Sequence, residues 1–155
     1  DADVAGDAPY RESKNFDAGE RAVVADVAGV GLGMAICYDV RFPQLFATLR
    51  QAGAQILTVP AAFTVPTGKA HWESLLRARA IETGCYVFAS AQTGVHECGR
   101  HTYGHSLIIA PWGEVLADAK TDVGFVTASV DLEAISQART RVPSLQHDRP
   151  FRMET

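Results

Sequence analysis

The chain has 155 residues, of which 47% are hydrophobic and 21% are charged, a composition typical of one globular domain. Its formal net charge of −4 leaves no broad basic surface, which argues against nucleic acid as a partner. Its apolar runs are far shorter than the roughly 20 residues of a membrane helix, so no membrane partner is expected. Three cysteines without close paired spacing favour a reducing compartment, and we therefore expect a cytoplasmic protein.

The first half of the chain predicts alternating strands and helices. Residues 1–20 mix acids, Gly, Pro and Ser without periodicity and predict an irregular lead-in. Two short strands are expected next, with glycines between and within them that mark a turn and close backbone approach. A helix follows that has Pro43 in its first turn and stops at Gly53. The ranges are strands over 22–29, 30–39, 55–63 and 85–92, and helices over 42–53 and 71–84.

The second half changes character, because short apolar segments are separated there by turn residues. Strands are expected over 105–113, 114–120 and 124–132, and a last helix over 132–141. No internal repeat and no linker divides the chain. The whole pattern predicts an α/β fold with one mixed sheet and helices on one face.

Cys37 lies where an apolar strand gives way to a helix. That position can present a thiol at the carboxyl edge of a sheet, where the positive end of a helix would favour the thiolate. It is also typical of a buried structural cysteine, because free cysteine is among the most buried residue types. The residues alone leave both interpretations open. Cys85, inside an apolar strand, is expected to be structural, and Cys98 is expected in an exposed loop.

Other motifs in the sequence are incomplete. The loop over 96–105 contains residue types that bind zinc, but a second spaced ligand pair is missing, and we expect no metal. "GVGLGM" has Met34 where a dinucleotide-binding loop needs its third glycine, and we expect no cofactor. "GHSLI" has Ile108 where a serine nucleophile elbow needs glycine. The arginines of "RARAIE" are expected to pair with Glu73 or Glu82. The potential zinc ligands are His96, Cys98, His101 and His105.

Five segments in order resemble the nitrilase superfamily of carbon–nitrogen hydrolases. "ICYDVRFPQL" is similar to the segment that carries its nucleophile, and the other four segments surround it over nearly the whole chain. Within this superfamily the five segments are most similar to the Nit branch. The segment "RARAIETGCYVFASAQTG" resembles in particular the enzymes that hydrolyse deaminated glutathione. The resemblance implies part of a four-layer α-β-β-α sandwich in which two sheets face each other. The other segments are "YRESKNFDAGE", residues 60–94, "YGHSLIIAPWGEVLADA" and "VPSLQHDRP".

The resemblance also implies an amidase that works through a Glu–Lys–Cys triad. Cys37 would attack the amide carbon of a small carboxylate-bearing substrate, form a thioester and release ammonia. The backbone N–H of Tyr38 would help hold the oxyanion, and Glu12 would lie beside the active site and orient the lysine. Arg41 would bind a substrate carboxylate or form an ion pair with Asp39 or Glu73. Ala62 and Phe63 would line the pocket.

The base glutamate and the lysine of the triad have no match in this sequence. Residues 1–155 are therefore expected to be the C-terminal portion of a single carbon–nitrogen hydrolase domain, without its N-terminal portion and inactive alone. Lys14 and Lys69 are not supported as substitutes by their spacing. We also expect a homo-oligomer that needs its missing half or a partner chain. Two alternatives stay open: a non-catalytic binding or assembly module of the same fold, and an amidase made of two separately encoded chains.

Overall fold

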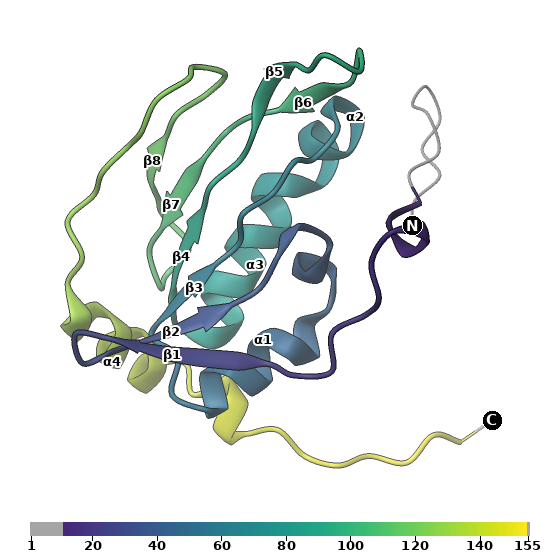
Figure 1. The fold of residues 1–155 in the computed structure, drawn as a ribbon. Coiled ribbons are helices and arrows are strands. Elements are labelled where there is room, and N and C mark those ends of the chain that lie inside the picture. Colours follow the sequence, from purple (N-terminus) through teal and green to yellow (C-terminus); the bar gives the residue numbers. More distant parts are fainter. Residues whose placement is uncertain (1–10, 155) are drawn as a thin grey trace.

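The computed structural model describes residues 11–154, which form one mixed sheet covered by helices, with a separate hairpin (Figure 1). The sheet has six strands in the order β1-β2-β3-β4-β7-β8. Strands β2, β3 and β4 run parallel to one another, and the other neighbours pair antiparallel. The strands are β1 Val23–Val27, β2 Val30–Met34, β3 Ile56–Thr58, β4 Tyr86–Ala89, β7 Leu107–Ile109 and β8 Val115–Asp118.

Helices α1 (Pro43–Gln51) and α3 (Glu73–Thr83) pack on one face of this sheet (Figure 1). Helix α1 begins at its proline, where the missing N–H costs no hydrogen bond, and α3 ends before Gly84. A single helical turn, α2 (Val65–Thr67), and a π-helical turn (Gly68–Trp72) lead into α3. Helix α4 (Leu132–Arg141) begins where the Asp131 carboxylate accepts the N–H of Glu133. None of the helices in residues 11–154 is long and apolar enough to cross a membrane.

The hydrophobic core lies between the sheet and helices α1 and α3. Side chains of neighbouring strands that point to the same face meet there, because successive residues of a strand alternate between faces. Leu57, Val87 and Ile109 occupy adjacent positions on β3, β4 and β7 and are fully buried. The fully buried helical side chains that pack on this face are Phe46, Leu49, Trp72 and Leu76.

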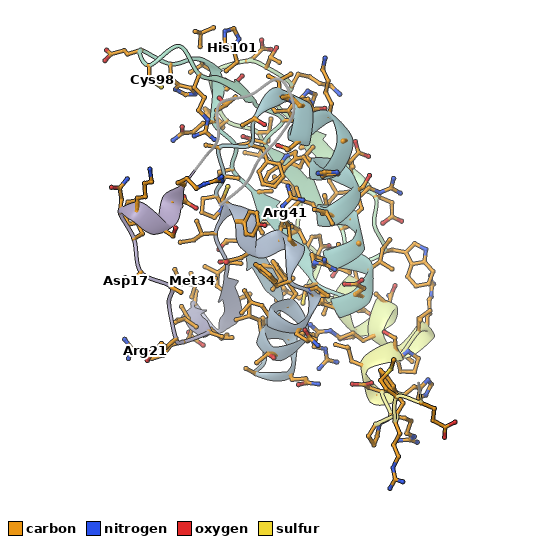
Figure 2. All side chains as sticks on the ribbon, turned by 90° about the vertical axis from the view of Figure 1, so that its right-hand side faces the viewer. Asp17, Arg21, Met34, Arg41, Cys98 and His101 are labelled. Atoms are coloured by element: carbon orange, nitrogen blue, oxygen red, sulfur yellow. The ribbon has the colours of Figure 1, made fainter. Side chains whose placement is uncertain are left out.

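The opposite face of the sheet is apolar but only partly covered. Met34 on β2 is 50% exposed and lies on the side turned away from α1 and α3 (Figure 2). Its paired neighbours on this face, Val23, Thr58 and Phe88, are also exposed or half-buried. The structure of the described residues therefore leaves one face of this sheet partly exposed.

The expected strands and helices of the α/β core are confirmed with narrower limits. The close backbone approach expected at the glycines of β2 is also confirmed, since a Cβ at Gly31 would overlap the carbonyl of Gly53. The lead-in is irregular from residue 11 except for one 3₁₀ turn, Glu12–Lys14, and residues 1–10 lie outside the described part.

Two expectations about the second half are wrong. Residues 124–132 form no strand, and their neighbourhood is open, with Val123 94% and Phe125 90% exposed. An apolar run becomes a strand only when it pairs with a neighbouring strand, and residues 124–132 pair with none of the strands of the described sheets. The polar stretch read as a loop is instead a hairpin of β5 (Thr93–Val95) and β6 (His101–Tyr103).

Candidate active site

The carboxyl ends of three parallel strands bring the site together. Backbone pairing continues past the ends of β2, β3 and β4, so the chain segments that follow them stay side by side. The N–H of Cys37 donates to the carbonyl of Pro60 at 2.9 Å, and the N–H of Ala61 donates to the carbonyl of Ser90 at 2.8 Å. Because parallel strands end at the same edge of a sheet, Cys37 is presented where open α/β sheets bind their ligands.

Cys37 has a left-handed backbone conformation, with φ of +46°. Few residues other than glycine adopt this region, and it persists only where the surroundings enforce it. Cys37 is the first residue of a short 3₁₀ turn (Cys37–Arg41), which Asp39 stabilises through two hydrogen bonds with Ile36. The Asp39 carboxylate accepts the N–H of Ile36 at 2.8 Å, while the Asp39 N–H donates to the Ile36 carbonyl at 2.9 Å.

The hydrophobic core anchors the far end of the same turn. The side chain of Val40 is fully buried, and its carbonyl accepts a hydrogen bond of 3.0 Å from Nε of Arg79 on α3. Arg79 and Arg77 also form the ion pairs with Glu82 and Glu73 that the sequence predicts. The thiol is thus held by packed elements on both sides of the turn.

The thiol of Cys37 faces a pocket of about 530 Å³. This is the size of pockets that hold small ligands. Glu12 and Ala62, which the resemblance places near the nucleophile, line it together with Cys37. Gln92, which follows β4, and Arg100, which precedes β6, also line it. The pocket therefore contains a thiol, a carboxylate and a guanidinium, and the rest of its lining is uncharged.

Burial raises the pKa of the Cys37 thiol above its ordinary value. The N–H of Ala62 and the charges of Arg100 and Arg41 lower the pKa, while the Glu12 charge raises it further. The expectation that a helix end favours the thiolate is therefore not met within the described residues. The turn at Cys37 is a short 3₁₀ turn, and the desolvation of the sulfur dominates. A thiol in this state needs a base to become a good nucleophile.

Three expected substrate residues do not line this pocket. Arg41 lies over the rings of Tyr38 and Phe63, at 5.4 and 5.2 Å from their centroids, and its Nη1 lies 3.3 Å from Nδ1 of His71. It forms neither of the ion pairs considered with Asp39 or Glu73 in residues 11–154. Phe63 is buried against Trp72, and the Tyr38 ring packs edge-on against Phe42. Lys14 and Lys69 also lie outside the pocket lining.

The potential zinc ligands do not converge. No group of three or more His, Cys, Asp or Glu side chains placed to bind a metal occurs in the described residues. Cys98 and His101 lie at the far end of the hairpin, well away from Arg41 (Figure 2). His96 contacts Thr102 at 2.8 Å, whereas His105 contacts Asp118 at 3.1 Å.

Sequence reasoning missed Arg100. Arg100 lies in the polar stretch between β5 and β6, where the histidines and the cysteine are the more obvious functional residue types. Its Nη2 donates to the carbonyl of Ala62 at 3.0 Å, which brings a residue 38 positions away into the pocket wall. The available signal was the glycine–arginine pair at the tip of a possible hairpin, which indicates a turn but not the direction of the side chain.

A parallel sheet core with a strained cysteine at its carboxyl edge defines an α/β protein with an enzyme-like site. The carbon–nitrogen hydrolase family matches residues 2–140. The chain therefore belongs to the carbon–nitrogen hydrolase family. Within the nitrilase superfamily it falls in the Nit branch, as the sequence resemblance indicates.

Known relatives agree in sequence and in fold. The deaminated glutathione amidase of Bos taurus is 49% identical over 152 residues, which cover 97% of this chain and 46% of the relative. The NitFhit protein of C. elegans superposes with a TM-score of 0.87 at 45% identity, covering 96% of this chain and 36% of that one. An amidase from Nesterenkonia sp. AN1, in a structure that shows acrylamide added to its active-site cysteine, has a TM-score of 0.70 at 27% identity. It matches 85% of this chain and 52% of its own. The chain thus spans about half the length of the deaminated glutathione amidases it matches.

Proposed function

We propose that this chain carries the nucleophile of an amidase that hydrolyses a small, carboxylate-bearing amide through a thioester on Cys37. The observation that carries the proposal is the left-handed cysteine at the sheet edge, open to a pocket that also contains Glu12. Deaminated glutathione is the candidate substrate, because relatives about 49% identical are amidases of that compound.

In this mechanism the Sγ of Cys37 attacks the carbonyl carbon of the amide and forms a tetrahedral oxyanion. The backbone N–H of Tyr38, which follows Cys37 in the 3₁₀ turn, donates to the oxyanion, while the ring of Tyr38 stays against Phe42 outside the pocket lining. The carbon–nitrogen bond then breaks, and the leaving nitrogen takes up a proton and departs as ammonia. Water next attacks the thioester, which releases the carboxylic acid and restores the thiol. No metal or cofactor takes part in this scheme.

The proposal needs a base that takes the proton of Cys37. Burial and the Glu12 charge keep the pKa of the thiol above its ordinary value, so at neutral pH the sulfur stays protonated without help. We assign Glu12 a positioning role beside the thiol. The base glutamate and the lysine would come from an N-terminal portion of the same domain, or from a partner chain, and residues 1–155 alone would be inactive.

The partly exposed sheet face supports this second part of the proposal. Val23, Val27 and Met34 on β1 and β2 are each about half exposed, which is unfavourable for apolar side chains of a sheet. A second sheet on this face would bury them and complete the sandwich. We further propose a cytoplasmic homo-oligomer, for which sedimentation of a monomer at micromolar concentration would be a contradictory result.

The first experiment replaces the nucleophile in the protein as its natural source makes it. Cys37→Ala should abolish ammonia release from deaminated glutathione, because no other thiol lines the pocket in the described residues. Cys98→Ser is the matched control, since Cys98 is exposed on the hairpin and should leave the rate unchanged. Ammonia release that persists in Cys37→Ala would contradict the nucleophile assignment.

A complementation experiment tests the need for a second half. Residues 1–155 should release no ammonia alone and should gain activity when the upstream half of the natural protein, or a partner chain, is added. Full activity of residues 1–155 alone would refute this part of the proposal. Absence of hydrolysis in every combination would favour the non-catalytic module.

A further inference from the structure

Two uncharged polar residues that follow β4, Ser90 and Gln92, line the pocket beside Cys37. The chain is extended there and pairs in parallel with the segment that follows β3. The N–H of Ala61 donates to the carbonyl of Ser90 at 2.8 Å, and the N–H of Gln92 donates to the carbonyl of Ala61 at 2.9 Å. Successive side chains of an extended segment alternate between its two faces, so Ser90 and Gln92 share one face, roughly 7 Å apart along the chain.

This shared face is the one turned away from helices α1 and α3. Ala89 is buried in the hydrophobic core, and Ala91 packs against the same core. The residues that alternate with these two alanines, Ser90 and Gln92, must therefore point away from the core, and both are exposed. Their side chains are thus directed to the open side of the sheet, on which the pocket lies.

A third hydroxyl in the pocket lining, that of Ser106, is already engaged. It accepts the N–H of Ala91 at 2.9 Å and donates to the carbonyl of Ala91 at 3.3 Å. Ser106 therefore holds the backbone between Ser90 and Gln92 in place. Within residues 11–154, the side chains of Ser90 and Gln92 form no hydrogen bond. The pocket thus presents two polar side chains on a fixed backbone that a ligand can reach.

The distance between this pair and the nucleophile sets the kind of ligand that can contact both. The segment after β3 accepts the N–H of Cys37 at Pro60 and pairs with Gln92 at Ala61. Neighbouring strands lie about 4.8 Å apart, so the backbones of Cys37 and Gln92 are separated by about 10 Å. Because the thiol and the glutamine side chain both face the pocket, a group only a few bonds from the scissile bond can reach Gln92.

We propose that Gln92, together with Ser90, hydrogen-bonds a second amide group of the substrate, so that the pocket prefers amides with a further peptide group a few bonds from the scissile bond. This inference rests on the proposed amidase function, which it deepens. A glutamine side chain offers one acceptor oxygen and an NH₂ donor, the same pair of groups that an amide presents, and the hydroxyl of Ser90 can also donate and accept. An analogue without the second amide would leave these polar groups without partners.

The kinetic test uses two amides that both carry a carboxylate, in the protein as its natural source makes it. One is N-succinyl-β-alaninamide, and the other is its analogue in which a methyl-branched ethylene unit replaces the internal peptide group. Gln92→Leu should lower kcat/KM for ammonia release from the first amide about 3- to 10-fold, the effect of losing a hydrogen bond between uncharged groups. The value for the analogue should change less than about twofold.

Gln51→Leu is the matched control, because Gln51 is an exposed glutamine of α1 outside the pocket lining. It should leave both values unchanged. Ser90→Ala removes only a hydroxyl and should shift the preference in the same direction as Gln92→Leu.

Two kinetic outcomes would overturn the assignment. Equal losses for both amides in Gln92→Leu would show that Gln92 supports the protein and does not read the second amide. Unchanged kcat/KM for both amides in this variant would show that the substrate does not reach Gln92.

A second measurement does not depend on amide hydrolysis. Two N-substituted iodoacetamides alkylate the thiolate of Cys37: the sulfur–carbon bond forms, the carbon–iodine bond breaks and iodide leaves. One reagent carries an acetamidoethyl chain, and in the other the same branched unit replaces the peptide group of that chain. The ratio of the first rate to the second, followed by mass spectrometry of the Cys37 peptide, should fall about threefold or more in Gln92→Leu. The ratio at the exposed Cys98 gives the internal reference.

The two measurements separate the failure of the inference from the failure of the proposed function. Absence of hydrolysis of both amides by the parent protein would count against the amidase, while the alkylation ratio would still decide the role of Gln92. An alkylation ratio at Cys37 that is the same in the parent protein and in Gln92→Leu would refute the inference.

Discussion

Arg79 and Arg77 make the same kinds of contact from neighbouring positions on α3, and they differ mainly in burial. Each donates from Nε to a backbone carbonyl, of Val40 for Arg79 and of Gly113 for Arg77. Each also pairs with a glutamate of its own helix. The side chain of Arg79 is 5% exposed, whereas that of Arg77 is 49% exposed. Replacement of each by methionine therefore isolates the effect of burial.

We expect Arg79→Met to lower the free energy of unfolding by about 2–4 kcal/mol. The Val40 carbonyl would lose a hydrogen bond from a charged donor, which is worth about 1.5–3 kcal/mol when the acceptor is left buried. Contact of the guanidinium with the Phe46 ring, at 5.6 Å, adds about 0.5–1 kcal/mol. The half-exposed Glu82 returns to water, so its ion pair adds little. Methionine keeps most of the apolar packing of the arginine stem.

Arg77→Met should cost only about 1 kcal/mol or less, because water can replace the lost donor at a half-exposed site. Urea unfolding of the natural protein and both variants, followed by far-UV circular dichroism, measures the difference if the m-values are equal. Equal losses of stability in the two variants would refute the reasoning from burial. Since Val40 anchors the turn that holds Cys37 in the core, Arg79→Met should also lower kcat, whereas Arg77→Met should not.

Two further predictions concern the hairpin and the edge of the sheet. Burial alone would raise the pKa of Asp118, but hydrogen bonds from Lys120 and His105 outweigh it and hold this pKa below its ordinary value. The Asp118 carboxylate therefore stabilises the fold above the pKa of an unfolded aspartate, about 4, and this contribution is lost as pH falls through the lower folded pKa. In thermal melts, the loss of stability that Asp118→Asn causes relative to the natural protein should be constant near neutral pH and should shrink below about pH 4. A loss of stability that grows on acidification would contradict the assignment. A Cβ at Gly68 would overlap the ring of Tyr103, so Gly68→Ala should destabilise the protein by about 1–3 kcal/mol in urea unfolding, and unchanged stability would show that the hairpin shifts freely.

The sequence predicts the elements of the core because local signals and burial agree there. Pro43 and Gly84 mark where α1 begins and where α3 ends, and the apolar runs around Leu57 and Val87 become the buried parallel strands. The strand expected over 124–132 also has an apolar pattern, but these residues pair with no strand of the sheet. Local composition cannot reveal that difference, because strand pairing is decided by segments far apart in the chain.

Two kinds of signal indicated the site residues: a strand end for Cys37, and the family resemblance for Cys37, Glu12 and Ala62. Cys37 and Ala62 come after β2 and β3, and the parallel pairing of these strands explains why both lie at one edge of the sheet. Arg100 lies on a hairpin that the sequence did not reveal, and a hydrogen bond to the carbonyl of Ala62 holds it in the wall of the same pocket. Phe63 fails as a pocket residue for the opposite reason, because its ring gains more by packing against Trp72 in the core.

The placement of Cys37 shows how the core positions a strained residue. A left-handed non-glycine residue costs about 1–3 kcal/mol, which a loop free in solvent would relieve by changing conformation. Here the residue before the turn is fixed by the Asp39 carboxylate, and the N–H of Cys37 is bound to Pro60. The residue at the far side, Val40, is fully buried and bound to Arg79. Relief of the strain would therefore break core packing or buried hydrogen bonds, so the thiol stays aimed at the pocket without support from a ligand.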